Sequence, residues 1–405
     1  MAYRIATVTY DWYPHEPRAL RMIEAAVDGG YEVDVLCAAR PAMKRFEVDG
    51  NTRIYRLPVP RVYDGSLLKT IIGWLAFLPV AGIALVWLQA RRRYDVIHVH
   101  NLPDFLVFCA LVPKLMGAKV ILDVQDVSPE LMAAKAGGSR RMRNLVVRLA
   151  KWQERAAVAF ADHVLTTGDI FEDILLRRGV PRRKLSSVLN SADPNLFNPS
   201  RSKPPYLGRS ESDRPFTFMY HGTLAQRNGL DIAVRALAIA RRCVPNLRLE
   251  IQGSGDQLPY LKRLAHELGI DDAVGFRGLT ELDGIAGFIE QGDVGIIPYR
   301  YTGFSEYVLP TKAYEYAWMQ RPIIASDTVA IRSMFRPESI VLCDPERPET
   351  FAEAMIDLYH NPTKRARLIA DAAEDYVPFR WEAMAQRYRD LLASLIEKRS
   401  AVGYA

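Results

Sequence analysis

Short, nearly continuous apolar runs recur along the whole chain and alternate with segments of helical periodicity. Gly, Pro, Asn or Asp bounds each run, and strands that are buried on both faces have this composition. We therefore expect an α/β fold of doubly wound parallel sheets with helices on both sides. The runs are RIATVTY, EVDVLCA, DVIHVH, KVILDV, HVLTT and LSSVLN in the first half, and FTFMYHG, LRLEIQG, VGFRG, DVGIIPY, PIIAS and SIVLCD in the second.

The two halves are separated by NPSRSKPPYLGRSESDRP, which is rich in proline, serine and charge and has no apolar periodicity. We interpret it as a linker. The 405 residues also exceed the ~250–300 at which one hydrophobic core usually stops growing. We expect an N-terminal domain over residues 1–200 and a C-terminal domain over residues 214–379. Residues 380–405 have helical periodicity and are expected to pack back on the N-terminal domain.

Glycines follow the first two strand-like runs of the second half. Gly222 and Gly229 bound one loop, and Gly253 follows the next run. The carboxyl ends of parallel strands meet at one edge of a sheet, where glycine lets backbone N–H groups approach a phosphate. Tight turns also require glycine, so a purely conformational role stays open. The first loop also contains Thr223, Arg227 and Asn228.

The segment LPTKAYEYAWMQRPIIAS places a lysine in the first turn of an expected helix, where the helix dipole disfavours a cation. Pro310 suits the first helical position, and Lys312 and Glu315 are spaced to share a face. A surface ion pair would explain this spacing. A bound diphosphate would satisfy both the helix terminus and Lys312, and Glu315 could accept hydrogen bonds from two ribose hydroxyls. The pattern favours a nucleoside diphosphate site.

Taken in order, HGTLAQRNGLDIAVRA, IQGSGD, VGFRGLT, GDVGIIPYR and LPTKAYEYAWMQRPIIAS resemble the C-terminal domain of retaining nucleotide-sugar glycosyltransferases of family four. YDVIHVHNLPD, VILDVQDVSPE and VLNSADPNLFNP resemble the N-terminal domain of the same family, so the likeness covers nearly the whole chain. The resemblance implies the GT-B architecture of two facing Rossmann-like domains with the site in the cleft between them. It implies a nucleotide sugar as donor substrate and no cofactor.

The resemblance assigns donor binding to the C-terminal domain. Glu315, as the second glutamate of a paired-glutamate motif, would bind the ribose, while Arg227 and Lys312 would act catalytically by stabilising the leaving diphosphate. The backbone of residues 309–311 would hold the diphosphate, and residues 277–279 would face the base. The other implied donor-binding residues are Gly222, Thr223, Asn228, Gly253, Arg277, Leu279, Leu309, Pro310 and Thr311.

The resemblance places His100 and Asp126 near the transferred sugar, as catalytic residues, and Asn190 at the floor of the cleft. A histidine in a strand is more often a satisfied core residue, which is our interpretation of His98. Asp126 could instead cap a helix. Asp11, His15, Glu16 and Arg18 follow the first strand, where a functional loop and a solvated loop are equally compatible with the sequence.

The chain departs from the family pattern at several positions. Thr223 and Asn228 stand where the family has an arginine and a lysine, with Arg227 one position away, and Gln125 replaces the histidine before Asp126. Tyr307 replaces the first glutamate of the motif, with Glu306 adjacent, so both remain candidate sugar contacts. No Asp-x-Asp cluster stands at a strand end, so we expect metal-independent transfer.

Residues Ile71 to Leu88 include no charge and precede Arg91–Arg93, as in a membrane span. Strand-like runs on both sides must share one sheet, so we expect one or two helices packed on the domain, where Pro79 would allow a break. An apolar side would dip into a membrane interface, and an ordinary buried helix is the alternative. Peripheral contact through residues 67–93, with the basic segments GGSRRMRN and RRGVPRRK, favours a lipid-linked acceptor in surface polysaccharide assembly on the cytoplasmic face of the membrane.

The net charge of +6 suggests an anionic partner. Nucleic acid is disfavoured, because basic residues do not alternate with aromatic stacking residues. Four widely spaced cysteines and a strand-like start indicate a cytoplasmic protein. Two other functions remain open, namely a nucleotide-sugar epimerase of the same architecture and a non-catalytic nucleotide- or sugar-binding partner of another transferase.

Overall fold

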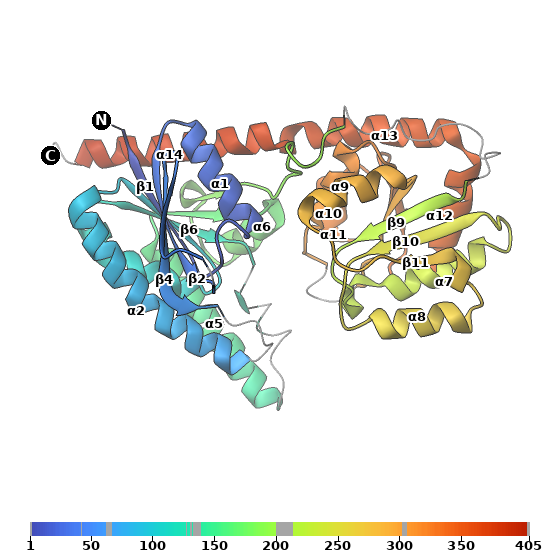
Figure 1. The fold of residues 1–405 in the computed structure, drawn as a ribbon, viewed down its shortest axis with the longest axis horizontal. Coiled ribbons are helices and arrows are strands. Elements are labelled where there is room, and N and C mark those ends of the chain that lie inside the picture. Colours follow the sequence, from blue (N-terminus) through green and yellow to red (C-terminus); the bar gives the residue numbers. More distant parts are fainter. Residues whose placement is uncertain are drawn as a thin grey trace. The chain divides into compact units, whose positions relative to one another are not determined.

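The computed structural model describes residues 2–41, 43–61, 67–126, 128–129, 132, 139–199, 214–301 and 306–402. Most of the predicted linker lies outside these residues. The chain forms two compact units, one made of Met1–Asn190 with Glu382–Ala405 and the other of Ser191–Trp381. Both units are α/β structures (Figure 1).

The N-terminal unit is built on a sheet with the strand order β3-β4-β2-β1-β5-β6-β7-β8. Within it, every neighbouring pair except β3 and β4 is parallel. The order reverses between β1 and β5, and ligands of doubly wound sheets bind at such a switch point. The strands are β1 (Arg4–Thr9), β2 (Glu32–Ala39), β3 (Phe46–Asp49), β4 (Thr52–Pro60), β5 (Val96–His100), β6 (Lys119–Val124), β7 (His163–Thr166) and β8 (Leu185–Ser187).

The β3–β4 hairpin departs from the expected all-parallel sheet. β3 pairs antiparallel with β4 at the sheet edge, with Phe46 opposite Tyr55, and all of its residues are exposed. Gly50, at φ 54°, lies in the tight turn between the two strands. Because an exposed edge strand has no continuous apolar run, the pattern that finds buried strands does not detect it.

Helices cover both faces of this sheet. Figure 1 shows α1 and α2 on opposite sides. On the side of α2, the 3-10 helix η1 (Asp104–Ala110) and helix α5 also contribute to one apolar cluster with the strands. The helices of the unit are α1 (Pro17–Asp28), α2 (Leu67–Arg92), α3 (Leu111–Leu115), α5 (Arg140–Phe160), α6 (Asp169–Arg177) and α14 (Trp381–Val402).

α2 is one continuous helix with Pro79 inside it, so the break that Pro79 would allow does not occur. Its inner side is buried at Phe77, Ala81 and Leu85, while Ile83 on its outer side is 73% exposed. Residues Lys69–Arg92 have the length and apolarity of a membrane span, with a mean hydropathy of 2.3. The helix connects β4 and β5, which belong to one sheet, so the chain cannot cross a bilayer here without disrupting that sheet.

The last helix, α14, packs on the N-terminal unit, which confirms that the C-terminal segment crosses back. The buried Tyr388 hydroxyl lies 2.8 Å from His98 Nδ1 in β5. The side chains of Met384, Leu392 and Leu395 are buried as well. The helical periodicity of this segment therefore marks the side of the helix that faces the sheet.

The C-terminal unit has a parallel sheet with the order β11-β10-β9-β12-β13-β14, so the expected doubly wound architecture is confirmed. Its switch point lies between β9 and β12. The strands are β9 (Phe216–His221), β10 (Leu247–Gln252), β11 (Val274–Phe276), β12 (Val294–Ile297), β13 (Ile323–Ser326) and β14 (Val341–Cys343). The helices are α7 (Leu230–Ala240), α8 (Leu258–Glu267), α9 (Leu282–Gln291), α10 (Thr311–Trp318), α11 (Val329–Met334), α12 (Pro348–His360) and α13 (Pro362–Tyr376).

The two sides of α2 predict opposite responses to truncation. Phe77 is fully buried, with its ring centroid 5.2 Å from that of Tyr10, so Phe77→Ala should lower the free energy of unfolding by about 3–5 kcal/mol. Ile83→Ala, in the same helix but exposed, should change it by less than about 0.5 kcal/mol. Urea titration of the full chain, followed by circular dichroism, measures both values. Equal losses would contradict the assignment of the two sides.

Candidate functional site

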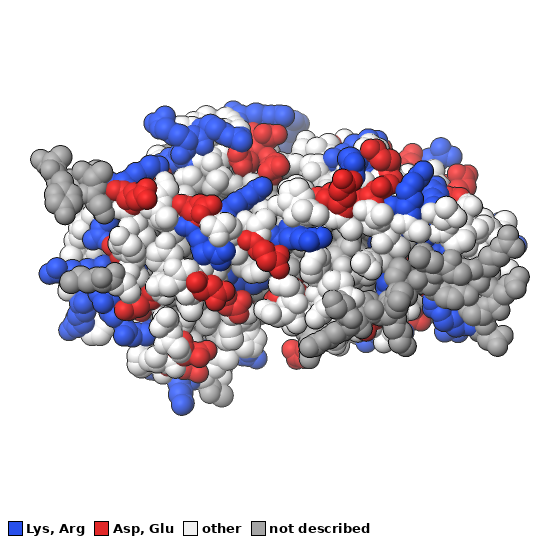
Figure 2. All heavy atoms as spheres, turned by 90° about the horizontal axis from the view of Figure 1, so that it is seen from above, with Lys and Arg blue, Asp and Glu red and all other residues white. Residues whose placement is uncertain are grey.

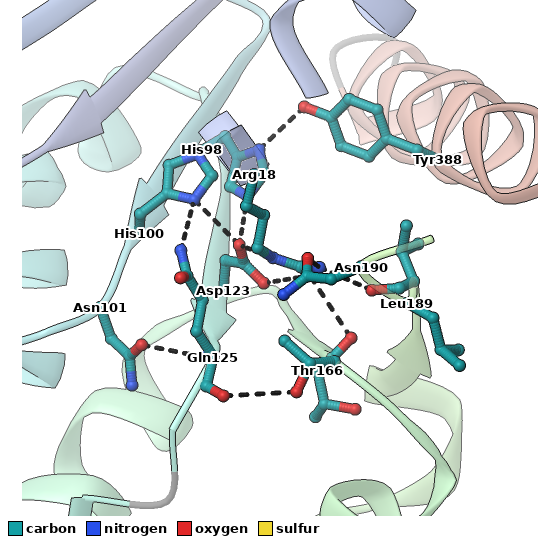
Figure 3. A network of polar contacts seen from close by, with 12 residues as sticks. Arg18, His98, His100, Asn101, Asp123, Gln125, Thr166, Leu189, Asn190 and Tyr388 are labelled. Carbon is teal, nitrogen blue, oxygen red and sulfur yellow. Dashed lines mark hydrogen bonds and ion pairs between the residues drawn. The ribbon is translucent and has the colours of Figure 1, made fainter. Parts of the chain in front are cut away.

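Strand β5 contributes apolar side chains to one face of the N-terminal sheet and polar side chains to the other. Ile97 and Val99 enter the apolar cluster beneath α2 and α5. His98 and His100 project from the other face into a polar network with α1 and α14 (Figure 3). Successive side chains of a strand alternate between the two faces, so the run VIHVH alone produces this division.

Arg18 of α1 lies at the centre of this network and is buried. Its Nε and Nη2 donate to the two carboxylate oxygens of Asp123, each at 2.7 Å. Its Nη1 donates to the Val188 carbonyl at 2.7 Å and to Asn190 Oδ1 at 2.8 Å, and Nη2 also reaches the Thr166 carbonyl at 3.4 Å. One side chain therefore ties α1 to β6 and to the ends of β7 and β8.

The start of α1 explains the position of Arg18. The Glu16 side chain caps the helix by accepting from the N–H groups of Arg18 and Ala19, and Pro17 occupies the first turn. The sequence was equally compatible with a solvated loop, whereas the structure buries Arg18. Asp123 escaped the sequence analysis altogether. The available signal was a single carboxylate inside the apolar run KVILDV, because a buried charge requires a partner.

His98 and His100 stack on each other, with ring centroids 4.3 Å apart. His100 Nδ1 lies 2.9 Å from Asp123 Oδ2. Burial, followed by the neighbouring His100, holds the pKa of His98 well below its ordinary value, so His98 is neutral. Burial alone would raise the pKa of Asp123, but Arg18 and His100 hold it below its usual range. His100 Nε2 is buried and has no hydrogen-bond partner among the described residues.

His98, His100 and Asp123 could also present ligand atoms to a metal ion, since these atoms lie within 4.8 Å of one another. However, both carboxylate oxygens of Asp123 already accept hydrogen bonds from Arg18. A metal cation would replace these bonds and be repelled by the buried guanidinium. The residues therefore fit a hydrogen-bond network better than a metal site.

The loop after β6 brings two predicted positions to the same sheet edge. The Gln125 amide nitrogen lies 3.2 Å from His100 Nδ1, so the residue that replaces the family histidine contacts His100. Asn101 binds the Gln125 N–H at 2.9 Å and the Asp126 carbonyl at 3.0 Å. Asp126 is half-buried, and Asn190 contacts Arg18 at the end of β8. His100, Asp126 and Asn190 thus all follow strand ends of one sheet.

In the C-terminal unit, Lys312 is buried between Tyr220 of β9 and Tyr299, which follows the end of β12. Its Nζ lies 3.0 Å from the Tyr299 hydroxyl and 3.4 Å from the Tyr220 hydroxyl. It also lies 5.0 and 4.4 Å from the centroids of these two rings. Burial acts to lower the pKa of Lys312, but the tyrosine oxygens that accept its hydrogen bonds raise it above its ordinary value. The ammonium is therefore charged, and no carboxylate in the described part of the chain pairs with it.

Glu315 pairs with His221 rather than with Lys312, so the surface ion pair that the sequence allowed does not form. His221 Nε2 lies 2.5 Å from Glu315 Oε2. His221 is buried at the end of β9, and its Nδ1 has no partner among the described residues. The sequence analysis did not single out His221, although a histidine directly before the strand-end glycine was the available signal.

The loops after β9 and β10 pack so closely that only glycine fits. A Cβ on Gly253, which has φ 142°, would lie 2.0 Å from the Gly222 carbonyl oxygen. A Cβ on the exposed Gly222 would lie 3.3 Å from Lys312 Nζ, so the ammonium is next to the open backbone of this loop.

In the loop after β9, one predicted side chain stabilises the loop and two others are exposed to solvent. Asn228 is buried and donates to the Thr223 carbonyl at 2.5 Å, so its amide holds the loop. Thr223 and Arg227 are exposed. The Arg227 guanidinium forms no ion pair with another described residue.

α10 begins at Thr311, and Pro310 precedes it in the capping position instead of occupying the predicted first helical position. Thr311 is exposed and Leu309 is half-buried. The N–H groups of Thr311 and Lys312 have no hydrogen-bond acceptor among the described residues, as is usual for a first helical turn. Together with Lys312 Nζ, they make this helix end a region of positive potential.

The remaining predicted positions of the C-terminal unit are Arg277, Leu279, Glu306 and Tyr307. The Arg277 guanidinium binds Glu250 at 2.9 Å and Gln291 at 2.6 Å, and it borders a cavity of about 200 Å³ near the start of β9. Leu279 is exposed. Glu306 Oε1 accepts a hydrogen bond from the Tyr301 hydroxyl at 2.9 Å, and Tyr307 is half-buried.

The Arg18–Asp123 pair predicts a pH-dependent stability. Asp123→Asn leaves a buried guanidinium without its counter-charge and should cost about 3–5 kcal/mol at pH 7. The folded-state pKa of Asp123 lies below its unfolded value of about 3.9, so the contribution is present above about pH 4 and is lost as the pH falls further. Urea titrations of both proteins from pH 7 to pH 3 should show the gap narrowing only below pH 4. Asp173→Asn, at an exposed position of α6, is the control and should cost less than about 0.5 kcal/mol.

Two family models match successive parts of the chain. Residues 15–190 match the glycosyl transferase 4-like domain, and residues 215–361 match the glycosyl transferases group 1. A D-inositol 3-phosphate glycosyltransferase from Acidothermus cellulolyticus is 30% identical over 92% of this chain and 87% of its own length.

Solved structures share the fold over nearly the whole chain. Sucrose-phosphate synthase from Thermosynechococcus elongatus superposes with a TM-score of 0.71 at 20% identity, covering 97% of this chain and 100% of its own. HepE from Anabaena, in complex with UDP and glucose, superposes with a TM-score of 0.68 at 16% identity, with the same coverage. These likenesses establish the architecture, and the sequence matches establish the relationship. The chain belongs to the family-four glycosyltransferases with the GT-B fold.

Proposed function

We propose that this glycosyltransferase moves a hexosyl unit from a nucleoside diphosphate sugar to an acceptor hydroxyl, with retention at the anomeric carbon and without a metal ion. The observation that carries the donor assignment is Lys312, a charged and buried ammonium that lacks a carboxylate partner among the described residues. It lies beside the exposed backbone of Gly222. A diphosphate is the anion that would neutralise it.

The leaving diphosphate gains charge as the glycosidic bond breaks, and fixed positive groups lower the energy of that state. Lys312 and the backbone N–H groups of Leu309 and Thr311, on either side of Pro310 at the start of α10, are proposed to hold it, as helix N-termini hold phosphates. Arg227 would add a second cation from the β9 loop. The backbone at Gly222 and Thr223 in the β9 loop and at Gly253 in the β10 loop would be accessible to the phosphate oxygens. Asn228 supports the β9 loop.

The remainder of the donor would extend from Glu315. Its carboxylate is positioned by His221 through Oε2, so Oε1 would be available for the ribose hydroxyls. The backbone from Arg277 to Leu279 would face the base, because the Arg277 guanidinium is engaged by Glu250. The presence of UDP in the structure of the related HepE supports UDP as the first nucleotide to test.

Contacts to the transferred sugar are proposed for His100 and Asp126, with Asn190 nearby. The unpartnered Nε2 of His100 supports this role, because it would otherwise stay buried without a hydrogen bond. Within the C-terminal unit, the proposed sugar contacts are Glu306 and Tyr307. Attack on the same face from which the diphosphate departs requires no enzymic nucleophile and gives retention.

The proposed acceptor is a lipid-linked glycan, and the proposed location is the cytoplasmic face of the cell membrane, in surface polysaccharide assembly. The exposed apolar side of α2, within residues 67–93, supports peripheral membrane contact. The enzyme would encounter an acceptor with a hydrocarbon anchor at the membrane surface.

Nucleotide binding is expected to raise the melting temperature of the full chain. A ligand at one hundred times its dissociation constant stabilises the folded state by about 2.7 kcal/mol. Thermal-shift measurements with UDP, GDP, ADP and dTDP, and with their sugar conjugates, should therefore identify one preferred base. The absence of a shift with every nucleotide would refute the donor site.

Two substitutions test the roles of the site residues. Lys312→Met and Glu315→Gln should each weaken nucleotide affinity about 10- to 100-fold, as expected for the loss of charge-assisted hydrogen bonds worth about 1.5–3 kcal/mol. Lys262→Met and Glu267→Gln, at exposed positions of α8, are matched controls that should leave the affinity unchanged. Isothermal titration calorimetry measures the affinities.

Transfer assays with the same variants separate the alternatives. Proton NMR of the product should show the anomeric configuration of the donor, and EDTA should not reduce the rate. Sugar interconversion without an acceptor would instead indicate an epimerase. Normal transfer by both site variants would overturn the assignment of the donor site.

A further inference from the structure

The outer surface of the helical layer over one face of the N-terminal sheet is apolar over several elements. In α2, the stretch between Thr70 and Ala90 has no charged residue, and Ile72, Ile83 and Trp87 are exposed on its outer side. α2 packs against η1 and α3, where Leu115 is 80% exposed. Exposed apolar side chains on adjoining elements form a larger patch than scattered surface residues do.

A groove of about 660 Å³ lies between α2 and the η1–α3 segment. Its walls are predominantly apolar and include Gly82, Ile83 and Trp87 from α2, and Phe108, Leu111 and Val112 from the other side. A groove lined almost entirely by apolar atoms offers few hydrogen bonds to a sugar, a nucleotide or a peptide backbone. It suits a hydrocarbon chain.

α5, which packs against η1, continues this surface with a different chemistry. Met142, Leu145, Leu149 and Trp152 are exposed, and their spacing places them in one stripe along the helix. Trp152 is 70% exposed. The exposed charged residues of α5 are all basic, namely Arg140, Arg141, Arg143, Arg148, Lys151 and Arg155.

The distribution of charge distinguishes α5 from an ordinary solvated helix. Its one acidic residue, Glu154, is buried and pairs with Arg178 at 2.5 Å. At the end of α2, the exposed Arg91 guanidinium lies 3.9 Å from the centroid of the exposed Trp87 ring. By contrast, basic and acidic side chains are interspersed over the surface that Figure 2 shows.

We propose that α2, α3 and α5 form one docking face for a bilayer that contains anionic phospholipid. α5 would lie in the headgroup region with its apolar stripe inward and its basic residues on lipid phosphates, and an acyl chain would enter the groove beside α2. Basic residues bordering exposed aliphatic and tryptophan side chains are typical of helices that lie in a membrane interface. A protein partner with an apolar surface would not require a uniformly cationic helix.

The face would lie on the membrane and would not cross it, because α2 joins two strands of the same sheet. This inference deepens the proposed peripheral location and rests on it, but it is independent of the donor nucleotide. It extends the contact from residues 67–93 and the basic segment GGSRRMRN to α3 and to the apolar stripe of α5, which the length of the apolar stretch in α2 does not indicate.

Flotation of the full chain with vesicles of phosphatidylcholine alone, or with a third of phosphatidylglycerol, tests the proposal. Binding should require the anionic lipid and weaken with salt. Neutralising Arg141, Arg148 and Lys151 to glutamine should weaken binding about a hundredfold, given the attraction of each cation near an anionic surface. The control neutralises the exposed Arg242, Arg248 and Arg263 of the C-terminal unit and should have no effect.

Insertion is measured separately by quenching of tryptophan fluorescence with brominated acyl chains. Quenching should fall in Trp87→Phe and in Trp152→Phe, while Trp318→Phe, in the C-terminal unit, should leave it unchanged. Absence of vesicle binding, or binding that the α5 substitutions do not weaken, would overturn the proposal. A dimer in lipid-free buffer that the same substitutions dissociate would assign the face to a second copy of the chain.

The nucleotide thermal shift distinguishes failure of this proposal from failure of the proposed function. An α5 variant that loses vesicle binding but keeps its nucleotide shift supports the docking face. Vesicle binding without any nucleotide shift would refute the donor site and leave the docking face intact.

Discussion

The N-terminal unit depends on the buried ion pair between Arg18 and Asp123. Two charges are removed from water there, and the cost is offset because each guanidinium nitrogen and both carboxylate oxygens have partners. Such a pair adds little net stability compared with apolar packing, but loss of one partner is expensive. It therefore acts as a specific connection that fixes α1 against the ends of β6, β7 and β8.

The same pair determines the state of the adjacent histidines. Asp123 Oδ2 contacts Nδ1 of His100, so Nε2 is the ring nitrogen of His100 that is left for another contact. His98 is bound to Tyr388, which places the last helix of the chain against the first sheet. The network thus combines a structural role with one unpartnered polar atom.

The two switch points differ in how their buried cation is balanced. Arg18, near the first, is neutralised by a carboxylate within the fold. Lys312, at the second, meets only tyrosine hydroxyls and rings among the described residues, so its charge stays uncompensated. This difference is the physical reason to assign Arg18 to the architecture and Lys312 to an anionic ligand.

The sequence by itself determined the α/β class and most of the buried strands, because apolar runs and helical periodicity are local signals. It also located the glycine loops and the α10 terminus. It missed the exposed edge strand β3, which lacks a buried run, and its neighbour β4, in which polar residues interrupt the apolar ones. Only the tertiary structure decided which polar groups meet. Arg18 and Asp123 are 105 residues apart, His221 and Glu315 are 94 apart, and His98 and Tyr388 are 290 apart. No local pattern encodes these pairs, because strand order and helix packing bring them together.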